Sequence, residues 1–550
     1  MTSARRSCFL KAVFANYPRL SIVFGCMFLL VMGIAPTALH SQTYTDLHDF
    51  NCSTDGCDPS NIGIMAQGRD GNLYGTLRAG GTSSLGTVFK STPAGAMTTL
   101  YNFSGPDGSH PYGGLTLGTD GNFYGTASAG GANGFGTIFK ITPTGVLTTL
   151  HSFTGSDGYT PYAPPVLGKN GSYYGVNFGG TAYSITSSGT FKLLNPAIGA
   201  NAYVPLILAS DGNFYGTTVG GGFGYGTVFR MSATGAVKII YNFDVTHGEY
   251  EYDPVVQGSD GFLYGPIPAG GSFASAQGLV FKLSTGGAIT VLHEFDAKSL
   301  TDGKHPYSGL VAATDGNFYG ATSEGNAGGS ALYGALFRIS KSGTYSVRHV
   351  FDLTHGGDQV ATWMQHTNGI LYGQAGGGAP GRGVFYSLAE GIPPFVSLVG
   401  NTFGTAGTTV EILGDGLTGT TKVLFGTGSA NFTVVSDTYM TAVVPASGVT
   451  GTVTVTTPGG TLKSKQLFKV LPVISSFTPT SGPVGTQVTI TGTGLTDATK
   501  VTFGGVKATV FNVVSGTQAK ATVPTGALTG KVALTTAGGS ATGPGTFTVN

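Results

Sequence analysis

The sequence predicts an all-β fold, and three observations support this prediction. Glycine is abundant, with 93 residues in a chain of 550, while charged residues make up only 10%. The phrase Asp-Gly-Asn-Phe-Tyr-Gly-Thr, which joins a tight-turn signal to a strand-like run, stands at residues 120–126 and recurs along the chain. After residue 394 the composition shifts to Thr, Val and Gly in short segments of alternating apolar and polar residues. Strands joined by glycine-containing turns account for all three features.

The repeated phrase divides most of the chain into seven units. The central tyrosines of successive copies are 50, 50, 41, 49, 55 and 53 residues apart. Periods near fifty residues are typical of propeller blades, so we predict a seven-bladed β-propeller over residues 43–391. The seven tyrosines are Tyr74, Tyr124, Tyr174, Tyr215, Tyr264, Tyr319 and Tyr372.

Each unit is expected to contain four short strands. In the second unit Asp120-Gly121 supplies the two-residue turn between the first two strands, since this turn requires positive φ angles. A glycine-rich loop follows the second strand, and Pro143-Thr144-Gly145 turns the chain into the fourth. The four strands are expected at residues 115–119, 122–127, 137–141 and 146–153.

The two ends of the repeat region complement each other. The seventh unit leaves through Gly391-Ile392-Pro393-Pro394 with no fourth strand of its own, whereas residues 46–50 carry the fourth-strand pattern before the first unit. We therefore expect the N-terminal strand to complete the last blade. Such a closure leaves no long open strand edge.

The repeat also resembles a known family. The segments Gly-Asn-Phe-Tyr-Gly-Thr, Gly-Thr-Val-Phe-Lys and Leu-His-Ser-Phe are together similar to the bacterial GloVer tandem repeats of choice-of-anchor proteins. The resemblance covers all seven units. It implies an exported, surface-associated repeat protein, and it carries no defined activity.

Two further units follow the repeat, at residues 392–470 and 471–550. Residues 407–417 align with residues 485–495, and period-two alternation in both predicts two β-sandwiches. Residues 477–485 resemble the opening of IPT/TIG immunoglobulin-like domains. That resemblance implies spacers, adhesion modules or appendages of carbohydrate-active enzymes. The family's DNA-binding role in some eukaryotic regulators is contradicted by the export signal and by the lack of clustered basic residues.

The N-terminus has the pattern of an export signal. A basic region is followed by an uncharged apolar run over residues 20–35, and we expect a signal peptide over residues 1–41. The alternative is an uncleaved membrane anchor, although the apolar run is shorter than the ~20 residues of a spanning helix. The signal predicts a secreted or cell-surface protein.

The mature chain retains two cysteines, Cys52 and Cys57. In an exported protein this close pair is a disulfide candidate, and two free thiols are the alternative. Two cysteines without a histidine pair at ligand spacing do not complete a zinc site, and the repeated aspartates lack the spacing of a calcium loop. We therefore predict no metal site and no cofactor.

The loops after each second strand and between units vary in length and content, so we expect binding on the face that they form. A tyrosine recurs at the start of the first strand, where it is suited to stacking on sugars or peptide side chains; packing between blades is the alternative. The segment Glu249-Tyr250-Glu251-Tyr252-Asp253 concentrates acidic and aromatic groups. The candidate ligand-binding residues are Tyr112, Tyr162, Tyr203, Glu249, Glu251, Tyr252, Asp253 and Tyr307.

The sequence favours a binding or adhesion protein that recognises an extracellular polysaccharide or a surface protein. No nucleophile-elbow or other catalytic motif is present, so no catalytic residue is proposed. The alternatives are an exported glycosidase or lyase and a structural component of a surface layer. Two carboxylates about 5 to 10 Å apart at the channel mouth would favour the enzyme. The histidines recur at repeat positions that tyrosines occupy in other units, which favours a structural role.

Overall fold

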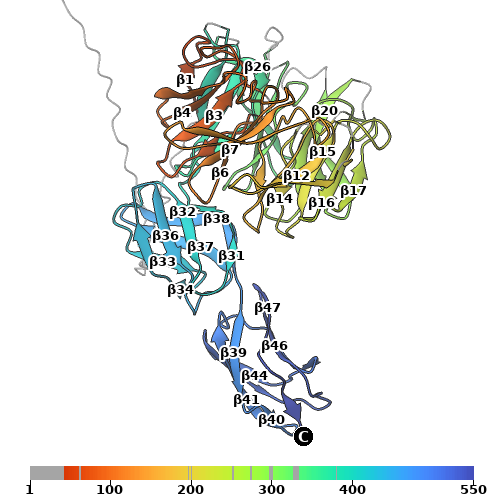
Figure 1. Cartoon of the computed structure of the whole chain (residues 1–550), viewed down its shortest axis with the longest axis vertical. Coiled ribbons are helices and arrows are strands. Elements are labelled where there is room, and N and C mark those ends of the chain that lie inside the picture. The colour runs from red at the N-terminus through yellow and green to blue at the C-terminus, as the bar shows by residue number, and fades with distance from the viewer. Residues whose placement is uncertain are drawn as a thin grey trace, which may run out of the picture. The chain divides into compact units, whose positions relative to one another are not determined.

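The computed structural model describes residues 42–60, 63–195, 197–199, 201–202, 204–249, 253–272, 275–296, 302–325, 333–352, 354–379 and 381–550. These residues form strands and turns and contain no α-helix, which confirms the all-β prediction (Figure 1). No helix in the described ranges is therefore long and apolar enough to cross a membrane. The predicted signal peptide, residues 1–41, lies outside them. Ser41–Asn550 form one compact unit.

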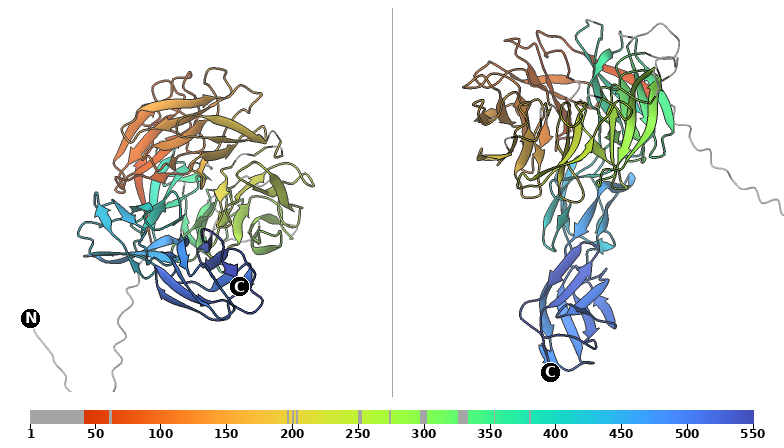
Figure 2. Two further views of the ribbon diagram at one scale, coloured as in Figure 1. Left: turned by 60° about the horizontal axis from the view of Figure 1, so that its bottom comes forward. Right: turned by 90° about the vertical axis from the view of Figure 1, so that its right-hand side faces the viewer.

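Within the described part of residues 43–389, each copy of the phrase lies in its own antiparallel sheet, and consecutive sheets lie beside one another (Figure 2). Four of these blade-like sheets contain β2 (Ala66–Gln67), β3 (Leu73–Leu77), β4 (Thr87–Ser91) and β5 (Met97–Asn102); β6 (Thr116–Leu117), β7 (Phe123–Ala127), β8 (Thr137–Ile141) and β9 (Leu147–Ser152); β10 (Val166–Leu167), β11 (Tyr173–Val176), β12 (Ala182–Ile185) and β13 (Phe191–Asn195); and β14 (Ile207–Leu208), β15 (Phe214–Thr218), β16 (Thr227–Met231) and β17 (Val237–Asn242).

The last three of these sheets follow the same strand order, except that the seventh contains the additional strand β26 and takes its outer strand from the N-terminus. They contain β18 (Val256–Gln257), β19 (Leu263–Ile267), β20 (Ala276–Leu283) and β21 (Ile289–Asp296); β22 (Val311–Ala312), β23 (Phe318–Thr322), β24 (Ala335–Ile339) and β25 (Tyr345–Val350); and β26 (Gly357–Val360), β27 (Met364–Gln365), β28 (Leu371–Gly376), β29 (Val384–Ala389) and β1 (Thr43–Asp49). The N-terminal strand β1 is thus the outer strand of the seventh sheet.

Strand β1 pairs antiparallel with β29, from Thr43 opposite Ala389 to Asp49 opposite Val384. The ring of Tyr44 stacks on that of His349 with centroids 3.6 Å apart, and its hydroxyl donates to the carbonyl of His355 at 2.6 Å. Backbone pairing and side-chain packing therefore both attach the N-terminal strand to the last repeat unit.

The side chains of the aspartate and the tyrosine in the phrase are joined by a hydrogen bond. The tyrosine hydroxyl donates to the aspartate four residues earlier, at 2.8 Å in the pair Tyr124–Asp120. Asn170 and Asn368 replace the aspartate in two units, and there the amide donates to Tyr174 at 2.9 Å and to Tyr372 at 3.1 Å. The other aspartate pairs are Tyr74–Asp70, Tyr215–Asp211, Tyr264–Asp260 and Tyr319–Asp315.

The glycine after the tyrosine makes room for an aromatic ring. Gly125 lies opposite Phe139 of β8, and a Cβ at Gly125 would lie 2.6 Å from Cζ of Phe139. Gly216 faces Phe229 in the same way, at 2.7 Å. The buried phenylalanine covers the backbone of β7 and its equivalents, so this glycine is required for packing and not for turn geometry.

The tyrosine also joins neighbouring sheets. The ring of Tyr74 stacks on Phe123 of the next unit at 4.0 Å, and that of Tyr264 stacks on Phe318 at 4.1 Å. Tyr372 of the seventh unit shares a hydrophobic cluster with Leu73 of the first. The seventh sheet therefore packs against the first.

Two sandwich units follow, the first of two sheets and the second of two four-stranded sheets and one two-stranded sheet, and each encloses its own hydrophobic core. The first contains β30 (Ser397–Val399), β31 (Phe403–Gly404), β32 (Thr409–Leu413), β33 (Lys422–Phe425), β34 (Gly428–Ser429), β35 (Phe432–Val434), β36 (Tyr439–Val443), β37 (Gly451–Thr457) and β38 (Gly460–Val470). The second contains β39 (Val473–Thr478), β40 (Ser481–Gly482), β41 (Gln487–Thr493), β42 (Lys500–Phe503), β43 (Val506–Lys507), β44 (Phe511–Ser515), β45 (Gln518–Thr522), β46 (Val532–Thr536), β47 (Gly539–Thr542) and β48 (Thr548–Val549). The order β30-β32-β36-β35 in the first recurs as β39-β41-β45-β44 in the second, so the two units share this topology.

The Asp-Gly turn of the first copy contacts the first of these sandwiches. The guanidinium of Arg69 lies 2.7 Å from the carboxylate of Glu411 and stacks over the ring of Tyr439 at 4.8 Å. The hydroxyl of Thr438 donates to the carbonyl of Arg69 at 2.8 Å. The Asp-Gly turn of the first copy therefore contacts another part of the same chain.

Candidate functional site

In four of the repeat units the two variable segments lie side by side. The segment that leads into a first strand forms a backbone bridge with the segment that follows the second strand of the same unit, as between Ser109 and Ala129. The same bridge joins Lys304 to Glu324 and Cys57 to Ala79. We call the surface made by these two sets of segments the loop face.

At one repeat position on the loop face, residues other than glycine adopt the left-handed backbone conformation. His110 has a φ of 53°; its N–H donates to Leu85 of the preceding unit at 2.8 Å, and its carbonyl accepts from Ser128 at 3.1 Å. The left-handed conformation thus lets one residue join two units. The residues with positive φ at this position are Asp58, His110, Thr160, Asn201 and His305. A constant backbone therefore presents a side chain that changes from unit to unit.

Aromatic side chains form a row across the second and third units. The ring of Tyr112 meets that of Tyr162 edge to face at 4.9 Å, and Tyr162 meets Phe178 at 6.0 Å. Phe178 in turn lies 6.2 Å from Tyr159, which is 40% exposed. Tyr112, Tyr162 and Phe178 are half-buried. We call these four residues the aromatic row.

Arg78 links the aromatic row to a charged cleft. Its Nη1 donates to the hydroxyl of Tyr112 at 3.2 Å, and the guanidinium carbon lies 5.4 Å from the centre of that ring. Its Nη2 lies 3.4 Å from Oδ2 of Asp58. Burial and the charge of Arg78 lower the pKa of His110, so the imidazole beside this site is neutral at pH 7.

The cleft beside Arg78 has a volume of about 230 Å³. It lies where loops of the first and seventh units meet, and glycines form much of its wall. Its lining residues are Asp58, Pro59, Arg78, Gly376, Gly377, Gly381, Arg382 and Gly383. Two guanidinium groups therefore share the cleft with one carboxylate.

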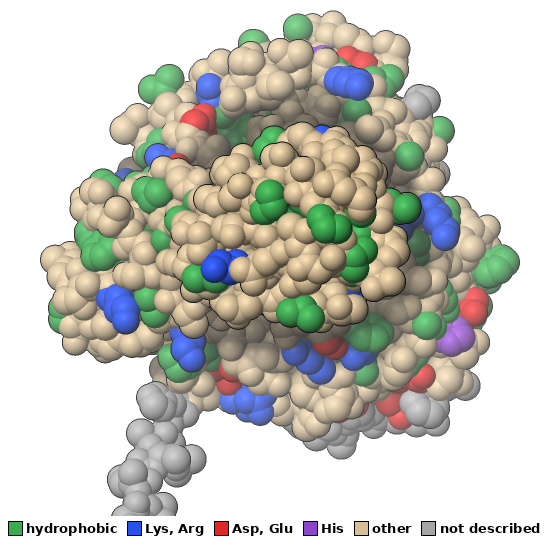
Figure 3. Space-filling view, turned by 90° about the horizontal axis from the view of Figure 1, so that it is seen from below, with side chains coloured by type: hydrophobic (Ala, Val, Ile, Leu, Met, Phe, Trp, Pro, Cys, Tyr) green, Lys and Arg blue, Asp and Glu red, His purple; other side chains and the backbone are tan. Residues whose placement is uncertain are grey.

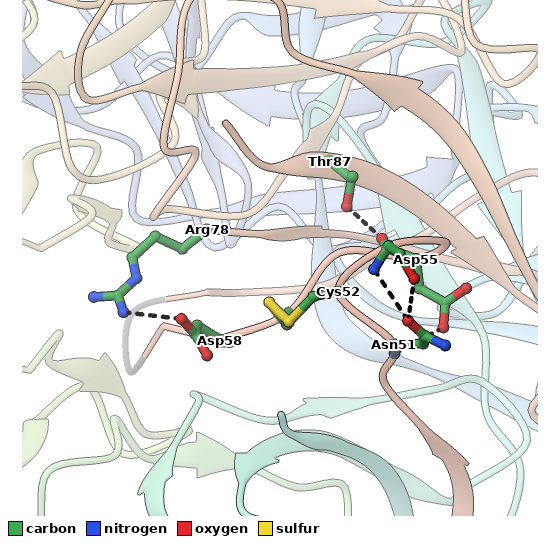
Figure 4. The surroundings of a disulfide bond; sticks show 8 residues. Asn51, Cys52, Asp55, Asp58, Arg78 and Thr87 are labelled. Atoms are coloured by element: carbon green, nitrogen blue, oxygen red, sulfur yellow. Dashed lines mark hydrogen bonds and ion pairs between the residues drawn. A yellow bond between two sulfur atoms is a disulfide. The ribbon is translucent and has the colours of Figure 1, made fainter. Parts of the chain in front are cut away.

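A disulfide supports one wall of this cleft. Cys52 and Cys57 are joined with their Cα atoms 4.8 Å apart (Figure 4). The N–H of Cys57 donates to the carbonyl of Ala79 at 2.9 Å, and Asp58 and Arg78 are the neighbouring residues on the two segments. The cross-link thus positions Asp58 opposite Arg78.

The structure brings together two of the residues chosen from the sequence, Tyr112 and Tyr162. Tyr307 lies in a different unit, beside His305 at 6.3 Å, and Glu249 pairs through its backbone with Ala269. Tyr203, Glu251 and Tyr252 lie outside the described residues.

Asp253, another candidate ligand-binding residue, does not reach the surface. Its side chain is fully buried, and burial raises its pKa well above the usual range for a carboxyl. Its backbone carbonyl accepts a hydrogen bond from Thr217 at 3.2 Å. Asp253 therefore belongs to the packed interior of the sheets.

A second cavity, of about 320 Å³, is lined by the first-strand region of all seven units. Its described lining contains no aspartate or glutamate. The lining residues include Ile64, Leu115, Val166, Leu206, Val255, Leu310 and Trp363, together with Lys465 of β38. Throughout the described ranges, no three His, Cys, Asp or Glu side chains are grouped as metal ligands.

Outer-strand histidines pack between sheets. The ring of His151 stacks on that of Phe191 in the next unit at 3.8 Å, and its Nε2 lies 3.0 Å from the carboxylate of Asp157. His293 stacks on Tyr345 in the same way at 4.0 Å. These contacts account for the two histidines as scaffold residues.

Arg78 and Phe178 were missed by the sequence analysis, although both occupy the same repeat position. This position follows the second strand, and its N–H donates to the residue with left-handed backbone described above. Because its residue type changes from unit to unit while the hydrogen bond stays, variation at this position was the available signal. The residues at this position include Arg78, Ser128, Phe178, Val219 and Ser323.

These features define a repeat-built all-β protein with an aromatic and charged surface on its loops. The chain belongs to the Gloeobacter/Verrucomicrobia repeat family, whose model matches residues 31–191 and 201–439. The IPT/TIG domain model matches residues 472–549. Both resemblances inferred from the sequence are thus confirmed.

Several solved structures are similar in part. A streptogramin B lyase is 14% identical over 63% of this chain and 97% of that chain, with a TM-score of 0.45. A catalytically inactive virginiamycin B lyase from Staphylococcus aureus, with quinupristin, is 15% identical over 63% and 99%, with a TM-score of 0.46. A surface glycan-binding protein from Prevotella bryantii is 19% identical over 28% and 41%, with a TM-score of 0.22. The search of curated proteins finds no match.

Proposed function

We propose that this chain is an exported binding protein, secreted or held at the cell surface, that binds an extracellular polysaccharide on its loop face. In this proposal residues 1–41 are a signal peptide. Residues 43–391 are a seven-bladed propeller that β1 closes. Residues 392–470 and 471–550 are two immunoglobulin-like spacers.

The aromatic row beside Arg78 is the observation on which the proposal rests. The apolar face of a sugar ring stacks on a half-exposed aromatic side chain, and its hydroxyls bond to polar groups at the edge. Tyr112 and Tyr162 supply rings with hydroxyl groups, and the guanidinium of Arg78 stands beside the first of them. Neighbouring rings of the row lie edge to face, so an extended chain of sugars meets ring faces and ring edges in turn.

The mature chain, residues 42–550, tests the proposal in a binding screen against soluble polysaccharides. We expect Tyr112→Ala and Phe178→Ala to weaken binding about tenfold each, since each removes a stacking surface. Phe223→Ala is the matched control, because Phe223 is 72% exposed in the loop of another unit.

Three outcomes would contradict the proposal. Unchanged binding by both row variants would exclude the aromatic row as the site. Release of shortened or unsaturated sugars would indicate an exported glycosidase or lyase instead. Ordered self-assembly of a chain that binds no glycan would indicate a structural surface-layer component.

A further inference from the structure

Two arginines and one aspartate line the cleft next to the aromatic row, and the carboxylate of Asp49 lies nearby. Its lining contains the guanidinium groups of Arg78 and Arg382 and the carboxylate of Asp58. Asp58 and Arg78 face each other at 3.4 Å, with side chains 38% and 33% exposed. No carboxylate in the described part of the chain lies within ion-pair distance of Arg382. Among the described side chains that line the cleft, Arg382 therefore has no ion-pair partner.

The two arginines also retain hydrogen-bond donors. A guanidinium has five N–H groups, and the contacts of Arg78 with described residues are one to Tyr112 at 3.2 Å and one to Asp58 at 3.4 Å. Arg382 is exposed, and its backbone carbonyl, not its side chain, accepts the N–H of Asp58 at 3.1 Å. Both side chains can thus donate to a bound anion.

The glycines of the cleft wall differ in how closely other atoms approach them. A Cβ built at Gly381 would have no atom within 4 Å, so the cleft is open at this residue. A Cβ at Gly383 would lie 2.6 Å from Cδ of Pro59, so the wall is closely packed at this residue. Asp49 lies nearby on β1, and its carboxylate accepts the N–H of Ala379 at 3.2 Å. Arg382 therefore lies between an open point of the wall at Gly381 and a packed one at Gly383.

We propose that the cleft recognises the acidic group of an anionic sugar, namely the carboxylate of a uronate residue, while the aromatic row stacks on the neighbouring sugars. This inference depends on the proposed polysaccharide binding and names its substrate class. The planar fork of an arginine matches a carboxylate with two parallel hydrogen bonds. Arg78 contacts both the ring of Tyr112 and the cleft, so a single polysaccharide chain can occupy the two surfaces together.

The test compares oligogalacturonate with its fully methyl-esterified form, which keeps the rings and removes the charge. The mature chain is expected to bind the acid about tenfold more tightly at low salt, and this preference should shrink at high salt because exposed charges are screened. Arg382→Gln should bind both forms equally, whereas Tyr112→Ala should weaken both. Lys238→Gln, which removes an exposed charge from the outer strand β17, is the matched control.

The outcomes separate this inference from the proposed function. Equal binding of acid and ester by the unaltered chain would overturn the inference and leave polysaccharide binding intact. Absence of binding to every glycan would overturn both. Tighter binding of a sulfated galactan than of oligogalacturonate would overturn the uronate assignment and assign the cleft to sulfate esters. An equal loss of preference in Lys238→Gln would show that general charge, not the cleft, selects the acid.

Discussion

The hydroxyl of Tyr124 donates a hydrogen bond of 2.8 Å to the carboxylate of Asp120, four residues earlier in the chain. The same carboxylate accepts the side-chain amide of Asn122 at 2.7 Å. Burial alone would raise the pKa of Asp120, but the hydrogen bonds from Asn122 and Tyr124 outweigh burial, and the pKa lies below its usual range. The repeated phrase thus joins its own turn to the tyrosine that packs on the next sheet.

This relationship predicts different effects for two substitutions of Asp120. Asp120→Ala removes the acceptor of the tyrosine hydroxyl and should lower stability by about 1 to 3 kcal/mol. Asp120→Asn should cost less than about 1 kcal/mol, because Asn170 and Asn368 form the equivalent bond in two other units. Differential scanning calorimetry of the mature chain measures both. A larger loss for Asn than for Ala would contradict this role of the bond.

The contact between Gly125 and Phe139 predicts a packing effect. Gly125→Ala places a methyl group 2.6 Å from the ring and should lower stability by about 1 to 3 kcal/mol. The double variant Gly125→Ala with Phe139→Leu should lose less than the sum of the two single changes, because the smaller side chain gives room. Thermal unfolding of the three variants checks this. If the stability losses of the two single variants simply add in the double variant, the ring of Phe139 is not what excludes a methyl group at residue 125.

The scaffold was more predictable from the sequence than the candidate site. Turn chemistry and strand alternation are local, so the Asp-Gly turn and the four strands per unit could be inferred from residues such as Asp120 and Gly121. Tyr112 and Tyr162 were found because they recur at one repeat position. Arg78 and Phe178 were not, since their role depends on which side chains meet between units. Variation at a repeat position marks it as a candidate, but it does not tell which side chains meet there.

The disulfide should affect the cleft more than the whole scaffold. Replacing both Cys52 and Cys57 by serine removes a short cross-link, and chain entropy predicts a loss of about 2 kcal/mol. Because Asp58 follows Cys57 and faces Arg78, glycan affinity should fall as well. Calorimetry and binding titrations, with and without a reducing agent, measure the two effects. Unchanged affinity in the double variant would separate the disulfide from the site.

Acidification should weaken the contact between the sixth and seventh sheets, where His349 of β25 stacks on Tyr44 of β1. Burial lowers the pKa of His349 to about 4, outweighing the attraction of Asp352, whereas an unfolded histidine titrates near ~6.5. His349 therefore takes up a proton more readily in the unfolded chain than in the folded chain. As the pH drops from about 6.5 toward 4, protonation of His349 lowers the free energy of unfolding, by at most about 1.4 kcal/mol per pH unit. His349→Phe should show a smaller loss of melting temperature between pH 7 and 5. The same loss in variant and unaltered chain would contradict this prediction.

The pairing of β1 with β29 predicts that the N-terminal strand protects the last sheet. Tyr44→Ala removes the stack on His349 and the bond to His355, and should lower stability by about 3 kcal/mol. Deletion of residues 43–49 should in addition expose the edge of β29, so that the amides of β29 which pair with β1 exchange hydrogen faster than those of β24 in the sixth sheet. Tyr159→Ala is the control for the loss of a tyrosine, because Tyr159 is 40% exposed. If the truncated chain keeps full protection in β29, the N-terminal strand does not close the ring, and the seven-bladed arrangement would have to be revised.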